Sequence, residues 1–264
     1  MSIADASMIR FLLFAGGLIF FLIIEAINPY RKSTVSKIER WFTNIPLAAF
    51  NAVIINLIFA ASIVHTISYV TADKVGILNI FELPYWINIL ATVIAMDFVL
   101  YVWHLLNHEV AFFWRFHVVH HCDLNMDVTT ATRFHIIELS FGTIIKIFTI
   151  YIIGADLLGV LIFESTIALA TQFHHSSLKI PGWFESVFWY LFVPPSMHRI
   201  HHSVVIKERN TNYGVIFSIW DRMLGTLLTK VYQDKILIGV GAYRKQEKLK
   251  FLNLLVLPFK RPVR

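Results

Sequence analysis

The sequence predicts an all-α, polytopic integral membrane protein with a histidine-rich helical cap on one side of the membrane. Two features of the composition indicate this class, since 57% of the residues are hydrophobic and only 15% are charged. The mean hydropathy of +0.65 is far above that of an ordinary soluble domain. The cap is predicted from the histidines, because eleven of the twelve lie in groups between His104 and His202.

Five apolar segments predict the membrane-spanning helices, because a helix needs about 20 predominantly apolar residues to cross a bilayer. In chain order they are residues 11–24, 45–72, 83–103, 136–153 and 157–173. The first has neither a basic leader nor a small-residue cleavage site, so we expect a retained span and not a secretory signal. No linker, low-complexity run or repeat divides the chain, and we expect a single membrane domain over residues 1–264.

The basic residues predict the orientation of these spans. Four of them crowd residues 31–40, after the first span: Arg31, Lys32, Lys37 and Arg40. By the positive-inside rule this loop is cytoplasmic, and every histidine group then emerges on the cytoplasmic face. A basic C-terminal tail contains Lys230, Lys235, Arg244, Lys245, Lys248, Lys250, Lys260, Arg261 and Arg264. In so apolar a chain the net charge of +6 indicates contact with lipid headgroups and not with nucleic acid.

Three histidine motifs have the spacing of metal ligands. They are H-x-x-x-H at 104–108 and H-x-x-H-H at 117–121 and 198–202. Residues three or four apart share one face of a helix, so the imidazoles of each motif point the same way. Together the motifs supply eight histidines, whereas a tetrahedral zinc site takes about four protein ligands, so we expect two metal ions. Imidazole suits iron, zinc and copper, and the spacing does not distinguish them.

The remaining histidines differ in what they predict. His175 adjoins the motifs in the expected topology, and we expect it to bind metal. Its neighbour His174 would point elsewhere on a helix, so a supporting role is favoured, with ligation as the alternative. His135 is a candidate for either role. His65 lies in the middle of a span, away from the groups, and is expected to be a packed helix residue.

Asp97 is an acidic residue inside the third span, on the helix face of Tyr101 and His104. A carboxylate within the membrane is costly and usually has a partner. One interpretation is a hydrogen bond to the far ring nitrogen of a metal-binding histidine, which fixes the tautomer of that ring. The other is a buried aspartate capped by Tyr101 or by a lysine.

Several other kinds of site are excluded. The single cysteine, Cys122, excludes an intramolecular disulfide, a cysteine-based zinc site and an iron–sulfur cluster. The sequence contains no H-E-x-x-H, no G-x-S-x-G and no glycine-rich nucleotide loop. Hydrolytic and nucleotide-dependent chemistry is therefore disfavoured, and any electrons must come from another protein.

The ordered series of motifs resembles the fatty acid hydroxylase/sterol desaturase superfamily of membrane di-iron oxygenases. The resemblance covers residues 90–228, roughly half of the chain. It depends on H-L-L-N-H at 104–108, H-V-V-H-H at 117–121, T-T-A-T-R-F-H at 129–135, H-S-S-L-K-I-P at 175–181, M-H-R-I-H-H at 197–202, N-T-N-Y-G at 210–214 and W-D-R-M-L-G-T at 220–226. Two positions depart from the usual pattern: Ser177 stands where asparagine is common, and Ile136 where proline is common.

The resemblance implies a function and a set of site residues. Two iron ions would be bound by His104, His108, His117, His120, His121, His175, His198, His201 and His202. Arg133, Glu138, Asn212 and Asp221 would support that site. The expected reaction is O2-dependent hydroxylation, or less favourably desaturation, of a sterol-like, carotenoid or fatty acyl lipid. A ferredoxin or a b-type cytochrome with its reductase would supply electrons. The alternative is a metal-handling or zinc-binding membrane protein without oxygenase activity.

Overall fold

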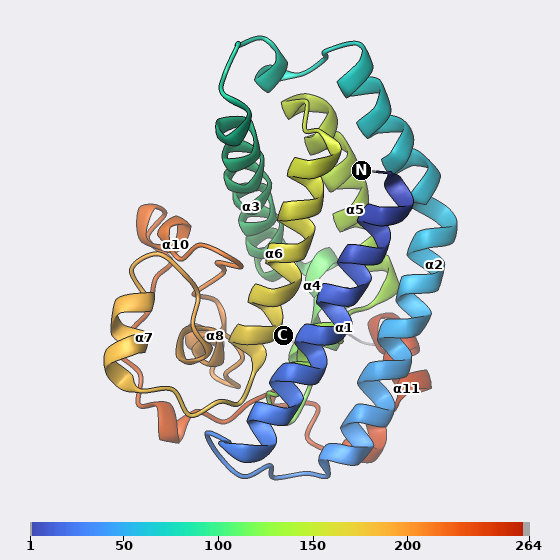
Figure 1. Ribbon diagram of the computed structural model, residues 1–264. Helices are drawn as coiled ribbons and strands as arrows, with labels where there is room; N and C mark the ends of the chain where they lie inside the picture. The colour runs from blue at the N-terminus through green and yellow to red at the C-terminus, as the bar shows by residue number, and fades with distance from the viewer. Residues whose placement is uncertain (1, 261–264) are drawn as a thin grey trace.

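The computed structural model describes residues 2–260, and Arg261 and Arg264 of the basic tail lie outside them. The described chain is almost entirely helical. Long helices run side by side, and short helices gather around one end of the bundle (Figure 1). Residues 2–260 contain isolated β-bridges but no β-strand. The predicted all-α class is confirmed.

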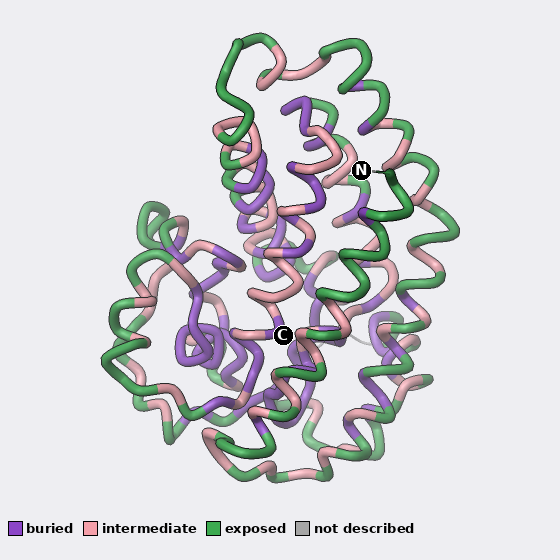
Figure 2. The backbone as a smooth tube through the Cα atoms, in the orientation of Figure 1, coloured by how far each residue is buried: buried purple, intermediate pink, exposed green. Residues whose placement is uncertain are grey.

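Five helices are long and apolar enough to cross a membrane. They are α1 (Ile3–Ile27), α2 (Lys37–Ala72), α3 (Tyr85–Glu109), α5 (Ile136–Ile153) and α6 (Leu157–His175). Large apolar side chains on their outer faces are exposed, among them Phe11, Phe20 and Leu57. Exposed apolar surface of this extent on long helices is expected where lipid is the solvent (Figure 2). The five predicted spans are confirmed.

The first two helices begin earlier than the hydropathy predicts. Helix α1 begins at Ile3, because Ser2 and Asp5 form a capping box that satisfies free backbone N–H groups. Helix α2 begins at Lys37, where the Ser36 hydroxyl accepts a hydrogen bond from the Glu39 N–H. Lys37 and Arg40 are therefore helical and not part of a loop.

All but one of the short elements cover the end of the bundle where α3 and α6 terminate. In chain order they are η1 (Ile77–Asn79), α4 (Ala111–His121), η2 (Val128–Thr132), α7 (Gly182–Phe188), α8 (Pro195–His201), α9 (Ile206–Arg209), α10 (Ile219–Met223), η3 (Gln233–Lys235), η4 (Gln246–Lys248), α11 (Phe251–Val256) and η5 (Leu257–Phe259). Of these, η1 belongs to the α2–α3 connection at the opposite end. Helices α4 and α8 are largely buried, and the backbone around them is the most continuously buried part of the fold (Figure 2). This buried cap carries both H-x-x-H-H motifs.

The turn between α5 and α6 depends on a glycine. Gly154 ends α5 in the left-handed conformation, with φ of 76°. A Cβ atom there would lie 2.4 Å from the side-chain nitrogen of Asn79, which itself donates to the Gly154 carbonyl. The glycine thus lets the chain reverse its direction between α5 and α6.

Candidate metal centre

Nine buried histidines form two adjoining groups. Within each group, one ring nitrogen from every histidine lies within 4.8 Å of those of the others. The first group is His104, His108, His117, His121 and His201. The second group is His120, His175, His198 and His202. The rings of His121 and His202, one from each group, stack with centroids 4.4 Å apart. The structure therefore brings together all nine histidines predicted as ligands.

Helix geometry explains how the motifs divide between the groups. His117 and His121 of α4 are four residues apart and share a face, and both belong to the first group. His120 projects elsewhere and belongs to the second group. In the other motif His198 and His202 share the second group, whereas His201 joins the first. Each H-x-x-H-H motif thus contributes to both groups.

Backbone carbonyls fix the orientation of several rings. The Nδ1 atoms of His104, His175 and His201 each lie 2.8 Å from a carbonyl oxygen, on Tyr213, Thr171 and Thr211 in that order. A carbonyl only accepts hydrogen bonds, so each Nδ1 carries the proton and donates it. The Nε2 atom of each ring then presents a lone pair to its group.

A carboxylate performs the same task for the first H-x-x-H-H motif. The Nδ1 atom of His117 lies 2.6 Å from Oε1 of Glu138, at the start of α5, and both residues are buried. A carboxylate behind a ligating imidazole orients the ring and raises its basicity. Glu138 is therefore placed where a supporting residue was expected.

The donor atoms fit metal ions. In the first group the Nε2 atoms of His104, His108 and His201 are buried, with no hydrogen-bond partner within residues 2–260. In the second group successive Nε2 atoms of His120, His175, His198 and His202 lie 3.0–3.1 Å apart. Four nitrogens bound tetrahedrally to one ion at about 2.0–2.1 Å would lie roughly 3.3 Å apart. Converging lone pairs at this spacing suit a shared cation.

The surroundings keep the cap histidines neutral. Burial lowers the pKa of His120, His121, His198, His201 and His202 well below the ordinary value, and neighbouring imidazoles lower it further. A neutral imidazole is the form that binds metal. The site is thus set for cation binding before any ion arrives.

Arg133 connects His120 to helix α2. Its guanidinium donates to the carbonyl of Val119 and to Oδ1 of Asn44, each at 2.9 Å. Its own carbonyl lies 3.2 Å from Nδ1 of His120. Arg133 therefore holds the end of α4 and the His120 ring together.

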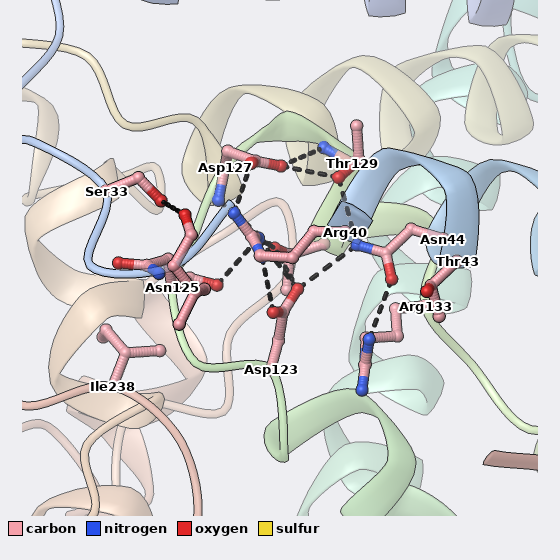
Figure 3. A network of polar contacts seen from close by, with 12 residues as sticks. Ser33, Arg40, Thr43, Asn44, Asp123, Asn125, Asp127, Thr129, Arg133 and Ile238 are labelled. Atoms are coloured by element: carbon pink, nitrogen blue, oxygen red, sulfur yellow. Dashed lines mark hydrogen bonds and ion pairs between the residues drawn. The ribbon is translucent and has the colours of Figure 1, made fainter. Parts of the chain in front are cut away.

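A buried ion network lies behind the end of α4 (Figure 3). Arg40 of α2 is fully buried and forms ion pairs with Asp123 at 2.6 Å and with Asp127 at 2.5 Å. Burial disfavours the ionised carboxylate of Asp123, but the facing Arg40 guanidinium outweighs this and holds the pKa of Asp123 below its usual range. Arg40 was expected among headgroup-contacting residues of a cytoplasmic loop, and that expectation is wrong because its charge is neutralised inside the protein.

This network was hard to predict from the sequence. Its visible signal is the pair of aspartates, Asp123 and Asp127, directly after H-V-V-H-H in a chain with few charges. Their partner Arg40 is 83 positions away from Asp123, and only the packing of α2 against η2 brings them together.

Asn212 and Asp221 shape the segment behind His104. Asp221 accepts from the N–H groups of Tyr213 and Gly214 at 2.8 and 2.7 Å. Asn212 has a positive φ of 59° and donates to the carbonyls of Met197 and Leu228. The Tyr213 carbonyl that orients His104 is thereby held in place.

Asp97 does not play either of the roles considered from the sequence. Its oxygens accept from the N–H groups of Ile216 and Phe217 at 3.0 and 3.2 Å and from the Trp220 indole at 2.8 Å. Tyr101, proposed as its cap, instead pairs with the Thr226 hydroxyl. Asp97 anchors the segment before α10 to α3, and its influence on the histidines is indirect.

His135 lies apart from the two groups. It is the N-cap of α5, where its Nδ1 accepts from the Ile137 N–H and its Nε2 faces the Leu255 carbonyl, each at 3.2 Å. Both nitrogens have hydrogen-bond partners, and His135 belongs to neither group. His174 belongs to neither group, although its ring lies 4.0 Å from that of His198.

A cavity of about 280 Å³ extends from the histidines into the bundle. Histidines of both groups line one end, including His104, His117, His120 and His175. Residues of α3, α5 and α6 form the remaining walls, which are mostly apolar. The cavity thus joins the candidate metal centre to the membrane-spanning part of the fold.

The sequence profile of the family described as Fatty acid hydroxylase matches residues 89–226, which contain every histidine of both groups. The chain belongs to the fatty acid hydroxylase family. The match covers more than half of the chain and coincides with the segment that forms α3 to α10.

Curated relatives of this fatty acid hydroxylase family member modify lipids. It is similar to the ornithine lipid hydroxylase OlsE of Rhizobium tropici, with 35% identity over 175 residues, 66% of this chain and 50% of that protein. It is similar to rat cholesterol 25-hydroxylase, with 25% identity over 58% of this chain and 50% of the relative. Alkylglycerol monooxygenase of Caenorhabditis elegans is 31% identical over 61% of this chain and 32% of the relative. The chain therefore matches half or less of the length of these relatives. No solved structure matches.

Proposed function

We propose that the protein is a membrane-bound di-iron oxygenase that hydroxylates an unactivated C–H bond of a membrane lipid, with O2 as co-substrate. One observation carries this proposal: two groups of buried, neutral imidazoles lie at the end of a mostly apolar cavity among membrane-spanning helices. The relatives named as lipid hydroxylases and monooxygenases support it.

Each histidine group would hold one iron ion. The first offers five imidazoles and the second four, so the protein supplies enough nitrogen ligands for two ions. When bound, the iron pair would supply the activation of O2 and the oxidation of the C–H bond. Glu138 and the carbonyls of Thr171, Thr211 and Tyr213 would keep the ligating nitrogens aimed at the ions.

The protein around the irons would select and position the lipid. The apolar walls of the cavity exclude water and accept a hydrocarbon segment from the bilayer. The position of that segment relative to the histidines decides which carbon reacts. Desaturation requires only a different placement of the same substrate and is the second outcome of the same chemistry.

The histidine cap would face the cytoplasm and receive electrons from a ferredoxin or a b-type cytochrome with its reductase. The C-terminal lysines offer a docking surface for an acidic carrier, because Lys230, Lys235, Lys245, Lys248, Lys250 and Lys260 are all exposed. Arg40 contributes nothing to that surface, since it is buried and paired.

Metal analysis tests the proposal. Protein purified in mild detergent from iron-supplemented cells should contain about two irons per chain, one for each histidine group, and Mössbauer spectra of an iron-57 sample should show a coupled pair. His120→Ala and His201→Ala, one from each group, should lose the coupled signal and lipid turnover. His65→Ala is the matched control, because His65 lies exposed on α2.

Two results would contradict the oxygenase. One is zinc that iron does not displace under anaerobic reconstitution, which would favour the metal-handling or zinc-binding alternative. The other is wild-type lipid turnover in His120→Ala and His201→Ala.

A further inference from the structure

An ion pair lies inside the membrane-spanning part of the cavity. Lys146 of α5 and Glu164 of α6 both line the cavity, and Lys146 Nζ lies 2.5 Å from Glu164 Oε1. The second oxygen, Oε2, lies 3.9 Å from the guanidinium of Arg10 on α1. The Arg10 side chain is 52% exposed, so it approaches the pair from outside the cavity.

The pair is remote from the metal groups. Glu164 precedes His175 by eleven positions along α6, which corresponds to about 16 Å at the helical rise of roughly 1.5 Å per residue. The lining between the two ends includes Leu139, Gly142, Ile167 and Ala168. The cavity therefore has a histidine end, an apolar middle and a charged end.

A structural role alone accounts poorly for these charges. Charged side chains within a bilayer are costly and are usually functional. Replacing a buried ion pair by apolar residues of similar size is often neutral or stabilising, so such a pair is weak evidence for a contribution to stability. Helices α5 and α6 also have other partners, since α5 packs on α2 and α3, and α6 packs on α1 and α3.

The pair retains hydrogen-bonding capacity. An ammonium group has three donors, and a carboxylate has about four acceptor positions, so one ion pair leaves several of each. A hydroxyl group beside the pair can donate to Glu164 and accept from Lys146 at the same time. A carboxylate has no proton to donate to Glu164 and would lie against its negative charge, and an amine would add a third cation beside Lys146 and Arg10. A hydroxyl binds the pair without either cost.

We propose that the Lys146–Glu164 pair binds the hydroxyl group of the lipid substrate, so that the hydrocarbon chain extends through the apolar middle toward the histidines. The substrate class is then a long-chain or polycyclic alcohol that carries its hydroxyl about 16 Å from the metal centre, by the helical rise along α6. The pair decides specificity and orientation and takes no part in the oxidation. This inference rests on the proposed lipid oxidation, but its test does not depend on turnover.

Photolabelling in lipid nanodiscs tests the inference. The probe is 1-dodecanol with a diazirine at carbon 11, and labelled peptides are located by mass spectrometry. In the wild type we expect labels at the histidine end, near Phe134 and Thr171. Unlabelled 1-dodecanol should compete with the probe on the order of tenfold better than dodecane or dodecanoate. The alcohol can hydrogen-bond to both charged groups, dodecane can bond to neither, and dodecanoate has no proton to donate to Glu164.

Two double variants remove the charges of Lys146 and Glu164 together, so that neither partner remains charged without the other. Lys146→Met/Glu164→Leu should abolish the preference for the alcohol and spread the labels along the cavity. Lys146→Gln/Glu164→Gln keeps neutral donors and acceptors, should retain part of the preference, and serves if the apolar pair does not fold. Thr143→Val is the matched control, since its hydroxyl lines the same cavity but donates to the Leu139 carbonyl within α5. It should bind as the wild type does.

The inference is overturned if dodecane or dodecanoate competes as well as 1-dodecanol. It is also overturned if the apolar double variant keeps the wild-type preference, even if its melting temperature changes, because the pair would then only connect helices. Iron content and lipid oxidation are measured on the same preparations. Their failure with intact alcohol binding would contradict the proposed oxygenase and leave this inference standing.

Discussion

The contact between His117 and Glu138 is the most direct link from a single residue to the metal centre. The carboxylate lies 2.6 Å from the ring nitrogen that faces away from the group, and both side chains are buried. Without an acceptor at this point, the ring of His117 would be free to rotate, and its other nitrogen would lose basicity. The rings of His104, His108 and His201 in the same group are oriented in this way by carbonyls or by Asn210.

Glu138→Ala should therefore weaken iron binding. We expect a loss of roughly 10- to 100-fold in affinity, the range typical of removing the residue behind a ligating histidine. Glu138→Gln keeps an acceptor oxygen and should lose less. The measurement is competition for ferrous iron with a chelator of known affinity. The exposed Glu247→Gln is the control, and equal affinities of Glu138→Ala and wild type would contradict the role of Glu138.

At the scale of elements, helix α2 supports a site to which it contributes no histidine. Arg40 binds Asp123 and Asp127 beyond the end of α4, and Asn44 binds both Asp123 and Arg133 (Figure 3). The segment that follows His121 is thus fixed by a helix that lies outside the family match, which begins at residue 89.

Removing Arg40 should destabilise the protein strongly. Arg40→Met leaves two buried carboxylates without their cation, and breaking a buried pair in this way costs about 3–5 kcal/mol. Arg40→Lys keeps the charge but loses the planar fork that reaches both aspartates, so we expect partial destabilisation. Unfolding in mild detergent measures both variants.

The triple variant Arg40→Met/Asp123→Asn/Asp127→Asn separates charge from packing. It removes the three paired charges together and should recover much of the stability lost in Arg40→Met. Glu39→Gln, an exposed position on the same helix, should unfold like the wild type. If Arg40→Met also unfolded like the wild type, the network would have no part in stability.

At the scale of the whole molecule, the two histidine groups join otherwise separate parts of the chain. Helices α3, α4, α6 and α8 each contribute histidines to these groups, and the imidazoles converge where the helices meet. A ligand that binds only the folded state stabilises that state by mass action. Metal ions at this point should therefore stabilise the cap more than the outer helices.

Removing the metal should loosen the cap selectively. Treatment with an iron chelator should lower the melting temperature by several degrees and increase hydrogen exchange in α8 and in residues 210–214. Exchange in the middle of α1 and α2 should change little, because these helices bind no metal. Hydrogen exchange with mass spectrometry checks both expectations. His120→Ala/His201→Ala is the control and should not respond to the chelator, and uniform loosening would contradict a local role of the metal.

The helical class, the five apolar spans and the nine clustered histidines were predictable from the amino-acid sequence alone. Each of these depends on residues close together in the chain: apolar runs longer than a bilayer, and histidines spaced to share a helix face. The sequence also located Glu138, because the family resemblance places it in a motif block.

Three features became clear only from the packing of the helices: which histidines share a group, which groups Asp97 binds, and which carboxylates pair with Arg40. These depend on contacts between distant segments, such as the 119 positions that separate Asp97 from Ile216. His135 is of a residue type that binds metal, but it lies at the N-cap of α5. Lys146 and Glu164 are charged residues within two apolar helices, and they pair because both face one cavity. Hydropathy records how apolar a segment is, whereas the direction of each charged side chain is fixed by the packing of the helices around it.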